Sequence, residues 1–395
     1  MRNKIKLINK ICPAILLSIA IGVILFEVLV RLLHFDASIN INWKYHPVLG
    51  WTQPPGGHYV YQQRLSNKIV DIRFNSKGFH DIEHQLMKPS GKKRIVVIGD
   101  SFCEALQVNL KDTFFKILEK RLNNKKEDWE VINLGVGDFG TAQEYIALLR
   151  YGFAYSPDVV IHQIFPLNDI GNNNIKLYGL CKSPNDKYRP YFVESEGSLK
   201  LTYAQPVKQF LRNNLVSYRI VEKLFSLLIE RFQELCRQYG ISRINLQKQL
   251  ERGGPEPLLY TYVDDAYQIE ATRNGWKITE KIIENISKEC VARNVQYIPM
   301  VVPFAESRNV SEWKKFCISN VSSAMVPFMM RDYPEIRLEK LFNRLGILGV
   351  FLLYSFEKYT DISLYQEGHF NEAGNLITAE ILWKEMQRRG LVADK

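Results

Sequence analysis

The stretch RIVVIGDSFCEALQV, residues 94–108, decides the fold and raises the question of function. The apolar run from Ile95 to Ile98 predicts a short buried strand. The run breaks at Gly99 and Asp100, and apolar spacing resumes after Ser101, which predicts a strand, a tight turn and a helix. Ser101 then has two interpretations: a cap of the helix, or a nucleophile presented at the strand end.

Strand-like and helical segments alternate along most of the chain. Apolar strand-like runs occur at 94–98, 129–135, 157–165, 296–302 and 349–354, and helical spacing occurs at 112–124, 141–153, 269–294 and 372–390. This alternation implies parallel strands joined by right-handed crossovers, and therefore predicts an α/β fold with a doubly wound parallel sheet. The alternation stops after Ile170. Residues 171 to about 265 are expected to form an insertion, with a helix over 216–240, that caps or walls the site.

The N-terminus has the pattern of a membrane anchor. Basic residues in MRNKIKLINK precede the apolar run 11–33, which as a helix would span roughly 34 Å, enough for a bilayer core of about 30 Å. Glu27 and Arg31 lie four residues apart and can pair near the membrane boundary. The basic flank favours a cytoplasmic N-terminus, with everything after residue 34 on the extracytoplasmic side, periplasmic or extracellular. A cleaved signal peptide is the alternative, with Ser18-Ile19-Ala20 as a weak cleavage motif.

The expected organisation has three parts. Residues 1–34 form a cytoplasmic basic stub and a transmembrane signal anchor, 35–90 a lead-in segment with short strands, and 91–395 the α/β domain with its insertion. The net charge of +10 is not gathered into a basic stripe with interleaved aromatics, so a nucleic-acid partner is not expected. The six cysteines have no CxxC spacing, and no His/Asp cluster has metal-ligand spacing, so no metal or organic cofactor is expected. The oligomeric state and any disulfide stay open.

Four polar clusters lie at or near predicted strand ends, where ligands collect in an open α/β sheet. They are Gly99-Asp100-Ser101, NLGVGDFGT (133–141), FPLNDI (165–170) and YQEGHFNEAG (365–374). Each alone is a common turn or cap composition, so Ser101, Asn168 and His369 taken singly have structural interpretations. Their joint occurrence in this order favours a catalytic site.

Together the clusters resemble the four blocks of the SGNH (GDSL-like) hydrolase family, which supply a serine, a glycine, an asparagine and a histidine. The resemblance covers about 94–170 and 290–390, and the anchored layout looks like the membrane-anchored, extracytoplasmic members. It implies a flavodoxin-like, SGNH hydrolase fold and action on ester bonds. It assigns these roles to Ser101, a glycine within 135–140, Asn168 and His369.

Acyl-transfer chemistry requires the same residue types. Ser101 needs a base to take its proton, and His369 is suited to this near neutral pH. The oxyanion needs donors fixed in advance, for which the backbone N–H of Ser101, a glycine N–H and the Asn168 side chain are the candidates.

Two positions depart from the family pattern. An aspartate usually orients the histidine, but the chain has Gln366 and Glu367 there. We expect Glu367 to face His369, because alternate residues of an extended segment project to the same side, and Gln366 is the uncharged alternative. In the second departure, alignment puts Asp138 where glycine is expected, and sliding by one residue makes Gly137 the oxyanion donor. A carboxylate beside an oxyanion would be unfavourable, so the Asp138 side chain should point away.

The sequence thus predicts a membrane-tethered serine esterase with a Ser101–His369–Glu367 triad and an acyl-enzyme intermediate. Its expected substrate is an acylated small molecule or glycan, with acetyl groups of cell-surface polysaccharide as one candidate. An O-acyltransferase with the same triad is one alternative. A catalytically weak polysaccharide-binding or assembly protein that kept the fold is the other.

Overall fold

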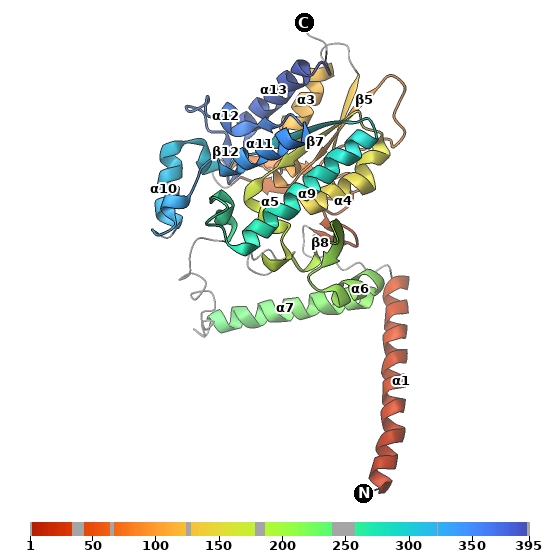
Figure 1. The fold of residues 1–395 in the computed structure, drawn as a ribbon. Helices are drawn as coiled ribbons and strands as arrows, with labels where there is room; N and C mark the ends of the chain where they lie inside the picture. Colours follow the sequence, from red (N-terminus) through yellow and green to blue (C-terminus); the bar gives the residue numbers. More distant parts are fainter. Residues whose placement is uncertain are drawn as a thin grey trace. The chain divides into compact units, whose positions relative to one another are not determined.

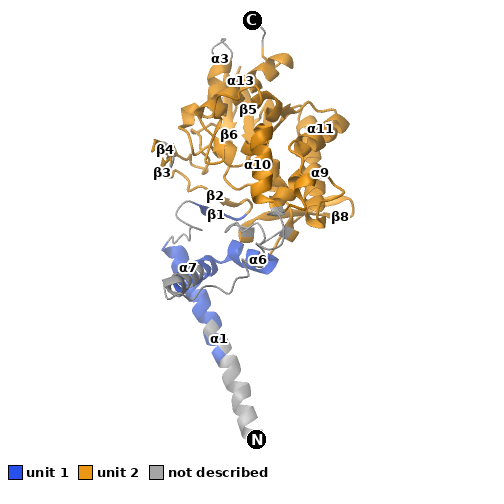
Figure 2. Ribbon diagram, turned by 90° about the vertical axis from the view of Figure 1, so that its left-hand side faces the viewer, with its two compact units in different colours: residues 1–47, 205–250 blue, residues 48–204, 251–395 orange. Residues whose placement is uncertain are grey.

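The computed structural model describes residues 2–33, 43–63, 67–123, 128–177, 186–238, 257–321 and 323–392. The chain forms two compact units (Figure 2). Unit 1 comprises Met1–Pro47 and Gln205–Leu250, and unit 2 comprises Val48–Ala204 and Glu251–Lys395. Most of the lead-in segment and the first part of the insertion therefore belong to the same unit as the sheet.

Unit 2 is built on a five-stranded parallel sheet in the order β11-β10-β7-β5-β6. The strands are β5 (Lys93–Ile98), β6 (Trp129–Asn133), β7 (Val159–Ile164), β10 (Gln296–Val301) and β11 (Val350–Phe351). Numbered along the chain, the order is 2-1-3-4-5, which is that of flavodoxin-like doubly wound sheets. The predicted parallel α/β sheet is confirmed. Its switch point, where ligands bind in such sheets, lies between β5 and β7.

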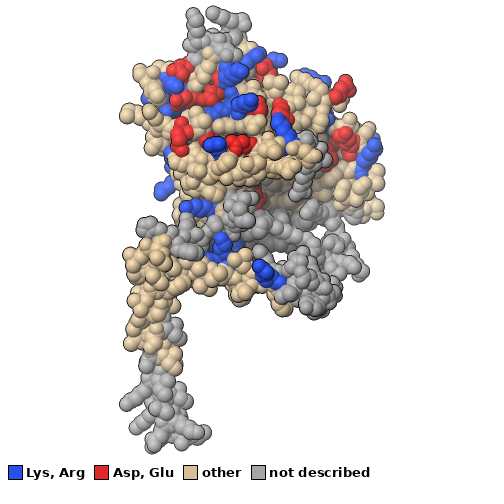
Figure 3. Space-filling model, turned by 180° about the vertical axis from the view of Figure 1, so that it is seen from behind, with Lys and Arg blue, Asp and Glu red and all other residues tan. Residues whose placement is uncertain are grey.

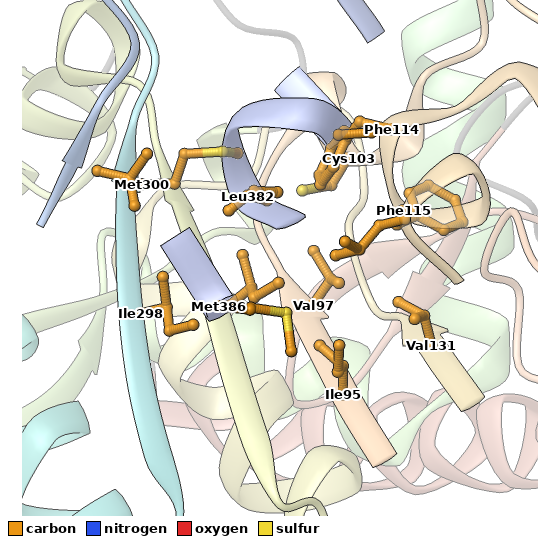
Figure 4. Close-up of a cluster of buried hydrophobic side chains, with 14 of the residues drawn as sticks. Ile95, Val97, Cys103, Phe114, Phe115, Val131, Ile298, Met300, Leu382 and Met386 are labelled. Atoms are coloured by element: carbon orange, nitrogen blue, oxygen red, sulfur yellow. The ribbon is translucent and has the colours of Figure 1, made fainter. Parts of the chain in front are cut away.

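Helices cover both faces of the sheet (Figure 1). α3 (Phe114–Asn123) and α13 (Glu372–Arg388) pack together on one face, and α4 (Thr141–Ala147), α5 (Pro166–Asn172) and α9 (Glu270–Ala292) lie on the other. On the α3/α13 face, Ile95 and Val97 of β5 join a buried core cluster with Leu382 and Met386 of α13 (Figure 4). This cluster fixes the sheet and the last helix to each other, and with them the segment just before α13.

Further elements surround the sheet. They are β2 (Gly50–Thr52), β3 (His58–Gln62), β4 (Ile69–Arg73), β8 (Pro190–Ser195), β9 (Ser198–Tyr203), β12 (Tyr365–Gln366), β13 (His369–Phe370), α2 (Ser101–Glu104), α10 (Val310–Asn320), α11 (Tyr333–Leu345) and α12 (Leu352–Phe356). β3 with β4, β8 with β9 and β12 with β13 form antiparallel pairs. The expected strand at 349–354 is only partly correct, because α12 begins at Leu352.

Unit 1 contains α1 (Arg2–Leu32), β1 (Lys44–His46), α6 (Pro206–Asn214) and α7 (Val216–Gln238). The helix predicted at 216–240 is confirmed. The expected Glu27–Arg31 pair is present, with 2.6 Å between Nε and the carboxylate. Within the described part of the chain, no helix has both the length and the hydropathy to cross a bilayer. The side chains of residues 2–14, 16 and 19 in α1 lie outside that part.

On the face of unit 2 seen in Figure 3, basic and acidic side chains are interspersed, and neither forms a large patch of one charge. Cys103, Cys290 and Cys317 are buried free thiols. The side chains of Cys12, Cys181 and Cys236 lie outside the described residues, so a disulfide among them stays open.

Candidate active site

Ser101 and His369, 268 positions apart in the chain, meet at the C-terminal edge of the sheet. The Nε2 atom of His369 lies 2.8 Å from Oγ of Ser101. Ser101 is the first residue of α2, directly after β5, while His369 is in β13, just before α13. The Phe102 ring supports the imidazole from within the core, at 5.2 Å between ring centroids. A neutral imidazole in this position can accept the serine proton.

The cap of α2 is Asp100 rather than Ser101. An Asp100 carboxylate oxygen accepts a hydrogen bond of 2.9 Å from the N–H of Phe102. This leaves the Ser101 hydroxyl to His369, so the helix-cap interpretation of Ser101 does not hold. Glycines bring the surrounding blocks close: a Cβ on Gly99 would lie 2.4 Å from Oε1 of Gln163, and one on Gly135 would lie 2.2 Å from Cβ of Cys103. The serine turn thus packs against both neighbouring strand ends.

His369 is presented by a tight hairpin. Glu367 and Gly368 have φ angles of +49° and +79°, the pattern of a two-residue type I′ turn between β12 and β13. The backbone carbonyl of Glu367 lies 3.1 Å from Nδ1 of His369. The carboxylate of Glu367 instead accepts a hydrogen bond from the Tyr61 hydroxyl. The expectation that the carboxylate would face the imidazole assumed an extended segment, and the turn puts the main-chain oxygen there instead.

Gln366 takes a structural part in the same hairpin. Its Nε2 donates a 3.0 Å hydrogen bond to the carbonyl of Gln107. Gln63 donates to the same carbonyl at 2.6 Å. The Gln366 side chain therefore ties the histidine hairpin to the segment that follows α2, rather than holding the imidazole.

The surroundings of His369 disfavour the charged form of its imidazole. Burial lowers the pKa of His369 below its ordinary 6.5, while the Glu367 carbonyl and the Glu367 charge act in the opposite direction. Lowering the pKa favours a free base at neutral pH. The Nδ1–H bond to a carbonyl then sets the tautomer in which Nε2 accepts.

Asn168 reaches the site from α5, which starts after β7 with Pro166 in its first turn. Its Nδ2 donates to a carboxylate oxygen of Asp100 at 2.8 Å. The same Asp100 carboxylate caps α2, so one side chain aligns both the serine helix and the asparagine amide. An amide nitrogen carries two hydrogens, and the second can serve an oxyanion.

Both the N–H and the carbonyl of Gly137 have hydrogen-bond partners within the protein. Its N–H binds the buried carboxyl of Glu104, and its carbonyl accepts from Nε1 of Trp51 at 3.1 Å. Gln53 completes the arrangement by donating to Glu104 at 2.6 Å. Gly137 therefore anchors the loop, and the expectation that its N–H serves the oxyanion is not supported by this geometry.

Asp138 has the backbone conformation of a glycine. Its φ is +64°, in the left-handed region that glycine favours and aspartate tolerates. Its carboxylate pairs with Nη2 of the buried Arg189 at 3.1 Å, and its carbonyl accepts from Nη1 of the same guanidinium at 2.7 Å. Arg189 also lies over the Trp51 ring, 4.9 Å from its centroid. The carboxylate that the sequence placed near the oxyanion is thus neutralised by a buried cation.

Further buried carboxyls lie behind this edge of the sheet. Burial raises the pKa of Asp100 to about 6 and that of Glu104 to about 7, and it raises the pKa values of Glu144 and Asp169 well above the ordinary range. Glu144 bonds Nε2 of His162 at 2.8 Å, and burial lowers the pKa of this histidine to about 3. Burial thus disfavours the charged form of both members of this pair. Among the described residues no cluster of acidic, His and Cys side chains could hold a metal ion.

Sequence reasoning missed the residues that support the site from outside the four clusters. Trp51, Gln53 and Tyr61 come from the lead-in segment, and Arg189 comes from the insertion. None has a local pattern that links it to Ser101. The sequence could have indicated a role for Glu104, because an acidic residue that is buried in the first turn after a strand requires a hydrogen-bond partner.

Comparisons with known proteins give remote structural likenesses. The sequence matches no protein-family model and no curated protein. Among solved structures, an acetyl xylan esterase gives a TM-score of 0.39 with 12% identity, covering 74% of this chain and 98% of that one. A psychrotrophic esterase from Pseudoalteromonas gives 0.38 and 8%, covering 76% and 99%. A lipase/acylhydrolase from Enterococcus faecalis gives 0.38 and 12%, covering 77% and 98%.

Proposed function

We propose that this chain is a serine esterase that removes ester-linked acyl groups. The observation that carries the proposal is the 2.8 Å contact between Ser101 Oγ and His369 Nε2 at the switch point of a parallel sheet. The depressed pKa of His369 and the fixed carbonyl on its Nδ1 favour a neutral base of the required tautomer.

In the proposed reaction, Ser101 Oγ attacks the ester carbonyl while its proton passes to Nε2 of His369. The Glu367 carbonyl accepts a hydrogen bond from Nδ1–H of the resulting imidazolium. The Ser101 N–H and the second hydrogen of Asn168 Nδ2 stabilise the oxyanion. His369 then returns the proton to the leaving alcohol, and water resolves the acyl-enzyme by the same base.

We also propose that residues 11–33 tether this activity to a membrane, with unit 2 on the extracytoplasmic side. The described side chains of α1 support this, because its large apolar residues are exposed, among them Leu17 at 63% and Leu25 at 63%. Acyl groups on cell-surface polysaccharide are then the substrates nearest to the site.

Hydrolysis of p-nitrophenyl acetate by the full chain tests the esterase assignment. Wild type should exceed the Ser101→Ala variant by at least about a thousandfold, the usual consequence of losing a nucleophile. Equal rates in the two proteins would refute it. Adding a sugar acceptor separates the transferase alternative, which predicts an acylated sugar in place of free acid. A folded protein inactive in both assays would favour the binding or assembly alternative.

A further inference from the structure

Within the described part of unit 1, α7 has an apolar face whose large side chains are mostly exposed. Val221, Leu224, Phe225, Leu228 and Phe232 are exposed by 55 to 67%. Their spacing of 3, 4, 7 and 11 residues from Val221 places them on one side of the helix. Val207 and Phe210 of the adjoining α6 are exposed by 73% and 65%. Large apolar side chains exposed in this number are typical of an interaction surface rather than of an ordinary solvent-facing helix.

The start of α7 is fixed to the end of α1. The Glu27 carboxylate accepts hydrogen bonds from the first two N–H groups of α7, at 3.0 Å from Val216 and 2.8 Å from Ser217. Arg31 donates to the carbonyl of Asn214 at 2.7 Å, just before α7. Val30 is buried against Ile220. An anion at a helix N-terminus is favourable, so this junction holds α7 at the level of the last two turns of α1.

That level is the boundary of the apolar segment 11–33. Within unit 1, α7 runs across the end of α1 rather than alongside it (Figure 1). If α1 crosses a bilayer, α7 lies in the plane of the lipid headgroups, because its first residues bind Glu27 and its axis runs across α1. An interfacial helix has this amphipathic character, with apolar residues on one side and basic residues around them.

The charge of α6 and α7 suits an anionic surface. The two helices contain six Lys and Arg residues against three Glu residues. One Glu, Glu222, is already paired with the buried Arg212 at 2.6 Å. Arg231 is exposed beside the apolar face, where its long side chain can reach lipid phosphates while its stem stays in the apolar layer.

We propose that α7, with Phe210 and Val207 of α6, lies on an anionic membrane surface with its apolar face among the acyl chains. This rests on the membrane tether of the proposed function and adds a second contact with the bilayer. The tether alone would leave α1, and with it unit 1, free to tilt and rotate in the bilayer. A helix bound in the plane gives the unit a defined orientation on the membrane.

Photo-crosslinking of the full chain tests this proposal. Benzoylphenylalanine replaces Phe225 or Phe232 on the apolar face, and Leu17 in α1 as the control for the tether. Lys223, two residues from Phe225 and about 200° around the helix, is the matched control on the polar side. Each variant is reconstituted in vesicles of phosphatidylethanolamine and phosphatidylglycerol, irradiated and examined by mass spectrometry. Fluorophosphonate labelling of Ser101 on the same samples reports the esterase site separately.

The expected result is a lipid adduct from positions 225, 232 and 17, with at least about tenfold less from 223, whose side faces away. A lipid adduct at 17 but none at 225 and 232 would overturn the proposal and leave the tether intact. A crosslinked dimer through 225 or 232 would overturn it in favour of a second copy of the chain. Loss of the adduct at 17 would overturn the tether, and with it this inference. Loss of Ser101 labelling alone would bear only on the esterase assignment.

Discussion

Arg189 holds Asp138 at two points, its carbonyl at 2.7 Å and its carboxylate at 3.1 Å. The guanidinium is itself buried, and it comes from the insertion rather than from any of the four polar clusters. It thereby fixes the loop between β6 and α4, which packs against α2, and it neutralises the one carboxylate in that loop. We expect this pair to govern how well the site tolerates a negatively charged oxyanion.

Replacing Arg189 with Met should lower kcat by on the order of tenfold or more, with KM little changed, because the Asp138 charge is then uncompensated. In an Asp138→Gly background, the same replacement should have a much smaller effect, since the charge is gone and glycine suits the positive φ. Esterase kinetics of the four proteins give the coupling. Strictly additive losses would show that Arg189 does not act on the site through Asp138. Thermal unfolding of each variant measures any effect on folding separately.

Asn168→Ala should reduce kcat by about 100- to 1,000-fold through the loss of an oxyanion donor, at nearly constant KM. Asp100→Asn should reduce kcat in the same way but by less, because an amide at this position aligns the Asn168 amide less well than a carboxylate does. Steady-state kinetics measure both. An Asn168→Ala enzyme with wild-type kcat would remove this residue from the oxyanion site.

Glu367→Gln should lower activity only a few-fold, because the main-chain carbonyl that holds Nδ1 of His369 survives the substitution. The charge of Glu367 raises the pKa of His369, so its removal should shift the acid limb of kcat/KM to lower pH. Tyr61→Phe is the matched control, since it frees the carboxylate without removing the charge. A loss of several hundredfold in Glu367→Gln would instead restore the carboxylate to the triad.

We expect the esterase activity of the wild-type protein to persist below pH 6.5, the ordinary pKa of histidine. Burial lowers the pKa of His369 from 6.5, so the imidazole stays neutral and able to accept a proton as the pH falls through that value. The acid limb of the kcat/KM profile should therefore have its midpoint below 6.5. A midpoint above that value would mean that the carboxylate charge outweighs burial.

Stability should fall as pH rises between the ordinary and the native pKa of Glu104. Burial raises this pKa from 4.5 to about 7, so in that interval the unfolded chain releases a proton that the folded chain retains. The contribution of this one carboxyl to stability is therefore greatest below about pH 4.5 and falls by on the order of 3 kcal/mol by pH 7. Glu104→Gln should flatten this slope, which denaturant unfolding at several pH values measures. An unchanged slope would show that Glu104 is ionised in the fold.

Much of the fold follows from local patterns. The strands β5, β6, β7 and β10 were predictable because each is an apolar run followed by turn residues, and the helices between them have clear periodicity. The pairing of Ser101 with His369 was also predictable, because the four polar clusters in their order resemble the blocks of a known hydrolase family. These features need no knowledge of distant side chains.

What could not be predicted depends on tertiary contacts and on backbone turns. The Glu367–Gly368 turn reverses the chain within two residues. The expectation that Glu367 and His369 project to the same side assumed an extended strand, and the segment between them is a turn. The partner of the Gly137 N–H, Glu104, lies outside the four clusters, so the sequence pattern around Gly137 could not indicate it. Arg189 and Trp51 support the loop from segments whose composition carries no catalytic pattern.

The most direct test of the account is covalent labelling of the full chain with a fluorophosphonate, read by peptide mass spectrometry. We predict one adduct, on Ser101, that disappears in Ser101→Ala and is lost or greatly slowed in His369→Ala. A folded wild-type protein that stays unlabelled, or one labelled equally fast without His369, would contradict the central claim that this histidine activates this serine.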